Sequence, residues 1–489
     1  MEASEVGGGI GDHALSEQSM VVPYWLVGLF GALVVSIPLS VKLYFMNVDL
    51  EVIVPAEVLI AVLAPIIGVM LLRKAWRKQL PLDLLRHPIT VLFVAYMLSA
   101  WITALFSVTP LVSIKAMVVR SAYFLLFYAV FLFIPMNSAM RIRSLLLYMA
   151  AFFVVVVYVL VRQSFSGFDR QGASFVPYPF YTDHTVYAAA LVFMLFLLGL
   201  WVFRPWSFSL AVPRSLRVVV LVVFAWALMV SFCRAAWISA AISGLVIVIL
   251  KLRLRMWQWA AMASTLLLVT LAWRAEVRAF LYSEAGDSYA ENVGLSGSIR
   301  SMVNLNNDSS NKERLNRWKC AYRMTRDRPW GGFGPGTFQF EYPRYQVKEQ
   351  RTYMSVDGPL EDWEITKAWS ISDQVFIRAN PQIHRVSGGT AHSEYLLTAS
   401  ESGVIVLLLQ LALFAGAFFL GFRCLVTATV PSGPLLYAVL ALLAYVVHGL
   451  FNNYLDDCKI AFLVHGTLAI IVRSDVERRR LAKTGSGTP

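Results

Sequence analysis

Arg234 is a single cation between two long apolar segments, in residues 231–237. Two membrane helices joined by so short a turn place its guanidinium at the membrane boundary. An arginine at such a position commonly reaches out to lipid headgroups. A guanidinium also pairs bidentately with phosphate oxygens, so the same residue can bind a lipid pyrophosphate. The position therefore indicates an anion site at one face of a membrane.

A polar helix is predicted over residues 308–327, and it carries a second group of cations. It has apolar residues at helical spacing and ends before Pro329. Arg314 and Arg317 are three residues apart and therefore share a face. A solvated charged face is the ordinary interpretation of such a run, and anion binding is the alternative. The cations are Lys312, Arg314, Arg317, Lys319, Arg323 and Arg326.

A glycine-rich turn follows this helix directly, in residues 329–338. Its glycines, among them Gly334, allow positive φ and a close approach of other groups to the backbone. Loops that cradle phosphate or sugar need both properties. Glycine-rich turns more often serve chain geometry alone. The turn is compatible with a binding loop, and by itself it does not indicate one.

His392 precedes an apolar helix that runs directly into a predicted membrane span. The positive end of the helix dipole disfavours an imidazolium there. The neutral imidazole is the form that accepts a proton, so His392 is a candidate general base. A structural role is the alternative, and it is the commoner one for a histidine considered alone.

A shorter loop, residues 162–184, combines aromatic residues and prolines with Arg170, Asp183 and His184. An interfacial belt of tyrosine and phenylalanine accounts for the aromatic residues. Such a belt does not need these three polar side chains together, so the loop is a second candidate for binding.

Membrane helices have to position all of these residues. The chain has 489 residues, 58% of them hydrophobic and 15% charged, with a mean hydropathy of +0.63. Soluble domains carry roughly 25% charged residues, and a bilayer excludes charge because an ionisable group at its centre is costly. Runs long enough to cross a bilayer predict about twelve helices. They lie at 22–46, 50–72, 88–107, 112–135, 143–162, 185–203, 217–233, 235–250, 257–273, 402–422, 434–451 and 458–472.

The placement of charge predicts the orientation of these spans. The net charge is +12, and cations gather in short loops on one side of the predicted membrane. This is the positive-inside asymmetry, and it predicts a cytoplasmic N-terminus. The basic balance therefore reports topology, and nucleic acid is not expected as a partner. The basic loops are 73–78, 140–143, 204–217, 251–255 and 478–480.

The predicted fold is an all-α polytopic membrane protein with one large, mainly helical periplasmic loop domain. The leader lacks the basic segment of a secretory signal, so the first span is expected to be retained. The predicted parts are a cytoplasmic leader at 1–21, transmembrane helices 1–9 at 22–273 with the short periplasmic loop at 162–184, the large periplasmic loop domain at 274–400, transmembrane helices 10–12 at 401–472, and a cytoplasmic basic tail at 473–489.

The cysteines indicate neither a metal site nor a redox motif. Cys233, Cys320, Cys424 and Cys458 show no CxxC spacing. A disulfide is chemically allowed among the three that are predicted at or beyond the outer membrane surface. The sequence also lacks the phosphate-binding loop of nucleotide-binding proteins, so no nucleotide is expected.

The order and sidedness of these features resemble the O-antigen ligase and O-antigen polymerase superfamily of polytopic membrane glycosyltransferases. Each motif is loose, and their combination over roughly residues 160–425 is more specific. Cys233 and Ser393 stand where the family commonly has serine and asparagine. The matching residues are Arg234; Arg314 with Trp318; Pro329, Gly332, Gly334, Gly336 and Phe338; and His392 to Leu396, followed by Glu401 and Gly403.

The resemblance implies transfer of a glycan from undecaprenyl pyrophosphate to an acceptor hydroxyl, with inversion and without a metal, cofactor or nucleotide. An O-antigen ligase is the first interpretation. Its acceptor is lipid A–core, and its site lies on the periplasmic side of a Gram-negative inner membrane. The implied roles are general base for His392, pyrophosphate binding for Arg234, Arg314, Arg317 and Arg170, and support for His184, Asp183, Glu394 and Gly334.

Other interpretations stay open. An O-antigen polymerase or a protein O-oligosaccharyltransferase differs from the ligase in its acceptor alone. A transporter or flippase for lipid-linked glycans would have a similar number of spans. Coupled transporters place acidic residues near the bilayer midplane, and the predicted spans contain almost none there.

Overall fold

The computed structural model describes residues 23–45, 50–134, 136, 138–203, 212–252, 264–265, 268, 309–347, 389–427 and 432–483. The predicted leader and nearly all of the predicted span 257–273 lie outside these residues. So do two long parts of the predicted loop domain, 274–308 and 348–388, and the end of the basic tail.

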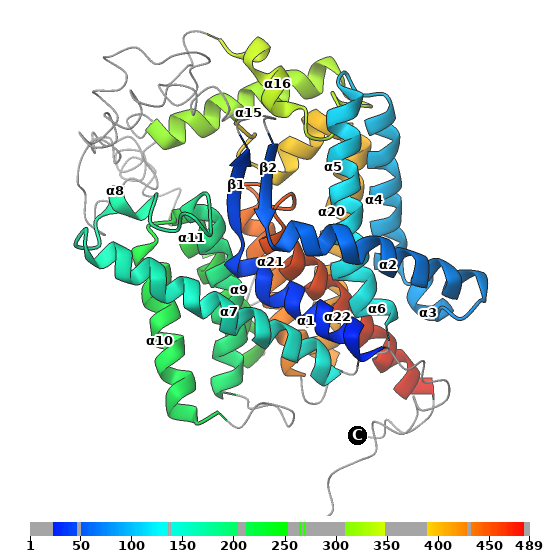
Figure 1. The fold of residues 1–489 in the computed structure, drawn as a ribbon, viewed down its shortest axis with the longest axis vertical. Helices are drawn as coiled ribbons and strands as arrows, with labels where there is room; N and C mark the ends of the chain where they lie inside the picture. The colour runs from blue at the N-terminus through cyan, green and yellow to red at the C-terminus, as the bar shows by residue number, and fades with distance from the viewer. Residues whose placement is uncertain are drawn as a thin grey trace, which may run out of the picture.

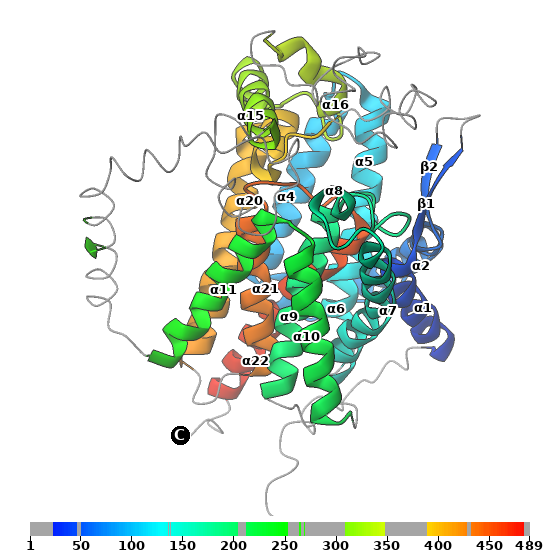
Figure 2. The same ribbon diagram turned by 90° about the vertical axis from the view of Figure 1, so that its left-hand side faces the viewer.

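Most of the described chain forms a helical bundle (Figures 1 and 2). Six of its helices are long and apolar enough to cross a membrane. Each predicted span other than 257–273 coincides at least in part with a helix, whereas the number of twelve spans stays a prediction. The bundle consists of α1 (Tyr24–Leu39), α2 (Ala56–Trp76), α3 (Leu82–Leu85), α4 (Pro88–Leu105), α5 (Pro110–Tyr123), the π-helix η2 (Phe124–Ala129), α6 (Val130–Phe133), α7 (Ser138–Ser164), α8 (Arg170–Ala173), α9 (His184–Phe203), α10 (Arg214–Val230), α11 (Arg234–Leu252), α20 (Glu394–Thr427), α21 (Gly433–His448) and α22 (Cys458–Lys483).

A β-hairpin replaces parts of the first two predicted spans, so the all-α expectation is wrong there. Strand β1 (Val41–Phe45) pairs with β2 (Leu50–Val54) in antiparallel register, with Val41 opposite Val54. Both strands are rich in β-branched and aromatic residues, which favour extended structure. The first helix consequently ends at Leu39, and α2 begins only at Ala56.

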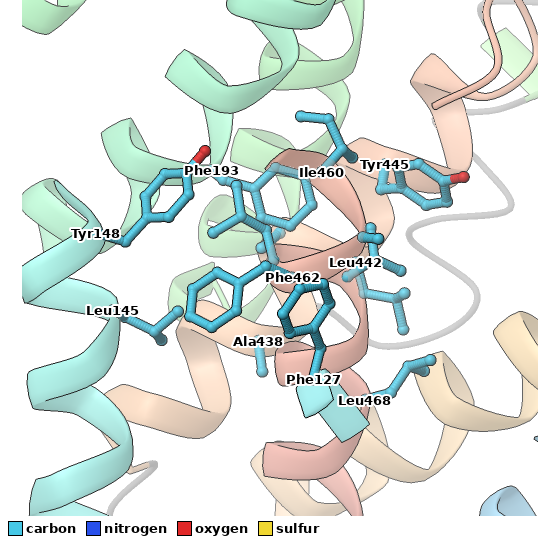
Figure 3. Close-up of a cluster of buried hydrophobic side chains, with 14 of the residues drawn as sticks. Phe127, Leu145, Tyr148, Phe193, Ala438, Leu442, Tyr445, Ile460, Phe462 and Leu468 are labelled. Atoms are coloured by element: carbon cyan, nitrogen blue, oxygen red, sulfur yellow. The ribbon is translucent and has the colours of Figure 1, made fainter. Parts of the chain in front are cut away.

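The core of the bundle surrounds α22. Residues Ile460 to Val464 on this helix are all 0% exposed, so α22 is buried on every side, as expected for a central helix that is apolar all round. Phe462 lies at the centre of the cluster in Figure 3, with its ring 5.4 Å from that of Phe127 and 5.5 Å from that of Tyr148. This packing supports the helices that carry the candidate site.

A smaller helical layer covers one end of the bundle, which we call the α15 end. It consists of α15 (Ser309–Asp327), α16 (Phe338–Glu341) and the 3-10 helix η3 (Tyr342–Tyr345), and it lies across the ends of α4, α5 and α20 (Figure 1). The helix predicted over 308–327 is thus confirmed. A separate apolar cluster joins the layer to the bundle; it includes Cys320, Met324, Phe333, Phe338 and Leu397.

Gly403 divides α20 into two helical pieces. Its φ of 82° and ψ of 173° are not helical, and only glycine adopts such angles without a steric penalty. The shorter piece, from Glu394 to Ser402, lies at the α15 end. The longer, apolar piece continues through the bundle to Thr427. The break coincides with the predicted junction of loop and span.

Candidate active site

The turn between α10 and α11 places Arg234 at the α15 end. Ser231 Oγ donates a hydrogen bond to Leu228 O at 2.7 Å, and Phe232 has a left-handed φ of 51°. Cys233 N then donates to Ser231 Oγ at 3.3 Å, and α11 begins at Arg234. A cation in the first turn of a helix opposes the helix dipole. The N–H groups of Ala236 and Trp237 in that turn already donate to Cys233 O, so the guanidinium of Arg234 is the group that can attract an anion here.

α15 lies beside this turn. Arg234 Nη2 is 3.5 Å from Asn311 Oδ1, in the first turn of α15. Burial raises the pKa of the Cys233 thiol to about 11, and Arg314 and Arg234 are near enough to oppose that rise. Arg314 Nε is buried and has no hydrogen-bond partner within the described part of the chain. Two guanidinium groups therefore lie near one turn, and Arg314 has a donor left for a ligand.

Arg317 is in a different environment, although it lies on the same helix. Its side chain is 6% exposed, and its Nε pairs with Glu313. Its Nη1 donates to Thr390 O at 3.0 Å, and its guanidinium lies 5.2 Å from the centre of the Tyr342 ring. Arg317 thus fastens the segment that precedes His392 to α15. These contacts favour a positioning role over the predicted contact with pyrophosphate.

The backbone of His392 is fixed from two sides. Trp318 Nε1 on α15 donates to His392 O at 3.2 Å. His392 itself has a left-handed φ of 48°, and α20 begins two residues later, at Glu394. The residue predicted to be the general base therefore lies just before a helix and directly below α15, and it is partly buried.

The surroundings of His392 keep its imidazole neutral. Burial lowers its pKa to about 3, and the cations Arg317 and Arg314 contribute to the same shift. Asp183 and the side chain of Asn452 oppose this shift without reversing it. At neutral pH the ring is therefore unprotonated and able to accept a proton.

The start of α9 forms another wall of the site. Asp183 caps this helix, since its Oδ1 accepts from Thr185 N at 2.8 Å and its Oδ2 from Thr185 Oγ1 at 2.9 Å. His184 Nδ1 lies 3.0 Å from Asp183 Oδ1. Burial raises the pKa of Asp183, but the hydrogen bonds from His184 and Thr185 outweigh burial and hold that pKa below its usual value. Asp183 is also near enough to raise the pKa of both Cys233 and His392.

The loop between α21 and α22 completes the cluster, and the sequence analysis did not identify it. His448 Nε2 lies 3.9 Å from Cys233 Sγ and 3.3 Å from Tyr454 OH. His448 ends α21, and Asn452 in the loop that follows lies near enough to His392 to raise its pKa. The available signal was a run of polar residues between two apolar spans, with a histidine and two asparagines in it.

Glu394 joins this loop to α20. Its Oε2 accepts from Tyr454 N at 2.9 Å, and its own backbone N donates to Gly449 O at 2.8 Å. These bonds support the predicted supporting role of Glu394, because they fix the start of α20 against the loop that contacts His392.

The glycine-rich turn packs against protein. Gly334 has a φ of 112°, its N donates to Glu401 O at 2.7 Å, and a side chain on it would overlap the Ser107 hydroxyl. Gly403 similarly packs against the carbonyl of Trp330. The space that a phosphate would need beside these glycines is filled by α20 and by the corner between α4 and α5. The contacts favour the geometric interpretation of this turn.

Helix N-termini add to the positive character of the site. α9, α11, α15 and α20 all begin beside the cluster. Asp183 and Glu394 offset the positive ends of α9 and α20. α11 and α15 have no acidic residue in their first turns. With Arg234 and Arg314, these two helix ends form a region suited to an anion such as a diphosphate.

The remaining predictions concern Arg170, the cysteines and metal binding. Arg170 begins α8 within the predicted loop 162–184, and its role in pyrophosphate binding stays a prediction. All four cysteines are free and buried. Within the described ranges, no group of three or more His, Cys, Asp or Glu side chains is arranged to hold a metal ion.

A family model described as O-antigen ligase matches residues 219–359. The matched range includes Arg234, Arg314, Arg317 and Gly334, whereas His392 lies beyond it. Among curated proteins, none matches this chain. The resemblance to the O-antigen ligase superfamily that the motifs indicate is thereby confirmed over residues 219–359.

Proposed function

We propose that this chain is a membrane glycosyltransferase that transfers O-antigen from undecaprenyl pyrophosphate to lipid A–core, on the periplasmic side of a Gram-negative inner membrane. The family match supports the reaction class. The observation that carries the proposal is the placement of a neutral His392 beside Arg314, near the turn that bears Arg234. A proton acceptor next to an anion site is what glycosyl transfer from a diphosphate requires.

Arg234 and Arg314 are assigned to the donor diphosphate. Charge accumulates on this group as the bond between the anomeric carbon and the phosphate oxygen breaks. Fixed cations and helix N-termini stabilise such charge without reorganising during the reaction. Arg314 Nε is buried without a hydrogen-bond partner among the described residues and can donate to this group, and the first turns of α11 and α15 contain no acidic residue that would repel it. The lipid diphosphate is the leaving group.

His392 is assigned to the acceptor. The acceptor hydroxyl attacks the anomeric carbon from the face opposite the diphosphate, which inverts the configuration there. The new carbon–oxygen bond forms as the hydroxyl proton passes to the neutral imidazole, and general-base assistance of this kind contributes about 10²–10⁴-fold. Arg317 and Trp318 hold the backbone around His392. The arginines supply the charge stabilisation, so a metal is not needed in this scheme.

A transfer assay with purified protein, lipid-linked O-antigen and lipid A–core tests the proposal. We expect transfer to continue in EDTA and to fall about 10²–10⁴-fold in His392→Ala. The matched control is Lys319→Gln, an exposed cation on α15, which should retain full activity. Wild-type activity in His392→Ala would exclude the general-base role.

The acceptor is tested separately in the same assay. Elongation of the lipid-linked donor without transfer to lipid A–core would favour the polymerase. Movement of the donor across the bilayer without any transfer would favour a transporter.

A further inference from the structure

Arg120 on α5 joins two segments that are distant in the sequence. Its Nε is 2.6 Å from Asp456 Oδ1, and its Nη2 is 3.0 Å from Asp456 Oδ2. The same Nη2 is 3.6 Å from Glu401 Oε2. The Arg120 side chain is 15% exposed and that of Glu401 3%. One largely buried cation therefore holds a carboxylate from α20 and another from the loop between α21 and α22.

Asp456 connects Arg120 to the loop that lies beside His392. Asp456 belongs to the loop that also contains Asn452, which lies near enough to His392 to raise its pKa. The same loop is attached to the start of α20 through the bond from Tyr454 N to Glu394. A bidentate arginine–carboxylate pair fixes geometry as well as charge, so Arg120 restricts how far this loop can move from His392.

Glu401 connects Arg120 to the helical layer that contains Arg314. Glu401 Oε1 accepts from Phe338 N at 3.1 Å, and Glu401 O accepts from Gly334 N at 2.7 Å. Phe338 in turn packs in the same apolar cluster as Met324 of α15. Glu401 therefore fastens the glycine-rich turn on which α15 rests, and Arg120 is the cation beside this buried carboxylate.

We propose that Arg120 is a positioning residue that keeps the α21–α22 loop and the α15 layer in fixed relation, so that His392 and Arg314 retain their mutual geometry. Both paired carboxylates depend on the same guanidinium. Without it, the buried Glu401 carboxyl would lose its cation, and Asp456 would lose its bidentate partner. The effect on transfer rests on the proposed function, whereas the effect on the loop does not.

The kinetic test compares Arg120→Gln with Lys115→Gln, which removes an exposed cation from the same helix. A small displacement of catalytic groups costs about 10²-fold in rate. We therefore expect kcat to fall to that extent in Arg120→Gln, while the donor KM changes by at most about threefold, because no substrate contact is lost. Arg120→Lys should be intermediate, since it keeps the charge and loses the bidentate geometry. Lys115→Gln should match the wild type.

A double variant tests whether Arg120 acts through Asp456. Asp456→Asn alone should lower kcat. Arg120→Gln/Asp456→Asn should be no worse than Arg120→Gln, because residues that act as one unit give non-additive effects. Strictly multiplicative losses would show that the two residues act independently, and would overturn the proposal.

Hydrogen exchange provides a readout that does not depend on activity. In Arg120→Gln and in Asp456→Asn we expect faster amide exchange in residues 449–457 and 389–394, with α9 unchanged as the control for folding. If the wild type fails to transfer glycan, the proposed function fails while this measurement still tests Arg120. Unchanged exchange at 449–457 would overturn the proposal. Faster exchange with an unchanged kcat would also overturn it, because the loop would then be held without any catalytic consequence.

Discussion

The charges around His392 are those that a donor would change. Burial, Arg317 and Arg314 lower the pKa of His392 to about 3, and a base this weak accepts a proton poorly at neutral pH. A diphosphate bound near Arg314 would add negative charge beside the imidazole and raise its pKa. Donor binding would therefore strengthen the base at the step where the reaction uses it.

This coupling predicts that kcat and kcat/KM decline at different pH values on the acid side of their pH profiles, which we call their acid limbs. The limb of kcat/KM reports the free enzyme and that of kcat the substrate complex. Because the base acts in its neutral form, activity is lost as pH falls through its pKa. We expect the kcat limb at higher pH than the kcat/KM limb, and Arg314→Gln should move the kcat/KM limb upward. Rates measured from about pH 2 to 8, a range that includes the free-enzyme pKa of about 3, test both points. Coincident limbs that do not respond to Arg314→Gln would contradict the coupling.

Substitutions of Arg314 and of Arg317 on α15 should have different effects. Arg317 and Glu313 form a buried pair, with 6% and 4% of their side chains exposed, and removal of one partner from such a pair costs about 3–5 kcal/mol. Arg317→Gln should therefore lower thermal stability. Arg314→Gln should preserve stability and reduce transfer, because Arg314 Nε has no partner among the described residues. Melting curves and donor KM values for both variants make the comparison. Equal losses of stability would remove the distinction between binding and positioning.

At the scale of the elements, the glycine-rich turn acts as a joint between α15 and α20. Gly334 combines a φ of 112° with close packing against Ser107. Gly334→Ala should therefore destabilise the protein, by about 1–3 kcal/mol from backbone strain and by more where the methyl group collides. Gly331→Ala is the matched control, since this neighbouring glycine has nothing within 4 Å of an added Cβ. Thermal unfolding of the two variants should separate them, and similar midpoints would argue against the joint.

The helices could be predicted because long apolar runs permit few other structures. The hairpin β1–β2 could not be predicted, because its strands lie within such runs and were therefore interpreted as helix. Val41–Phe45 and Leu50–Val54 continue apolar runs, and hydropathy alone does not distinguish a short strand from a helical turn. The break in α20 at Gly403 was predictable only as a junction. Its cause, the close approach of Trp330, is a tertiary contact.

Candidate site residues could be proposed from the sequence where a motif contains them, and could not where only the fold brings residues together. Arg234, Arg314 and His392 were identified from their spacing. Asn452 was missed because its loop reaches His392 through bonds between segments that are far apart in sequence. For Arg317 and Gly334 the contacts favour other roles than the predicted ones, for a related reason. The sequence shows only that a residue is an arginine. Its contacts in the structure are needed to distinguish an arginine that binds phosphate from one that holds a loop in place.

At the scale of the whole molecule, the candidate site and several basic residues next to predicted spans lie at opposite ends. α9 and α11 begin at the α15 end, and α10 begins at the other end with Arg214 and Arg217 (Figure 2). The C-terminal half of α22 lies there too, where Asp475 pairs with His87 and Arg480 pairs with Asp83. The positive-inside rule assigns the basic end to the cytoplasm. The α15 end, with His392, would then face the periplasm, where both proposed substrates carry their glycans.

Cysteine labelling tests this orientation, and the chain suits the method because its native cysteines are at most 3% exposed. Tyr322 on α15 is 64% exposed, and Arg77 lies exposed in a predicted cytoplasmic loop. In intact spheroplasts, a membrane-impermeant maleimide should label Tyr322→Cys and leave Arg77→Cys unlabelled. After lysis both variants should react, which shows that each thiol is accessible, and the unsubstituted protein measures the background. The reverse pattern would place His392 in the cytoplasm, on the wrong side for a lipid-linked glycan that has already been flipped, and the proposed ligase would have to be abandoned even if its fold and its basic cluster were correct.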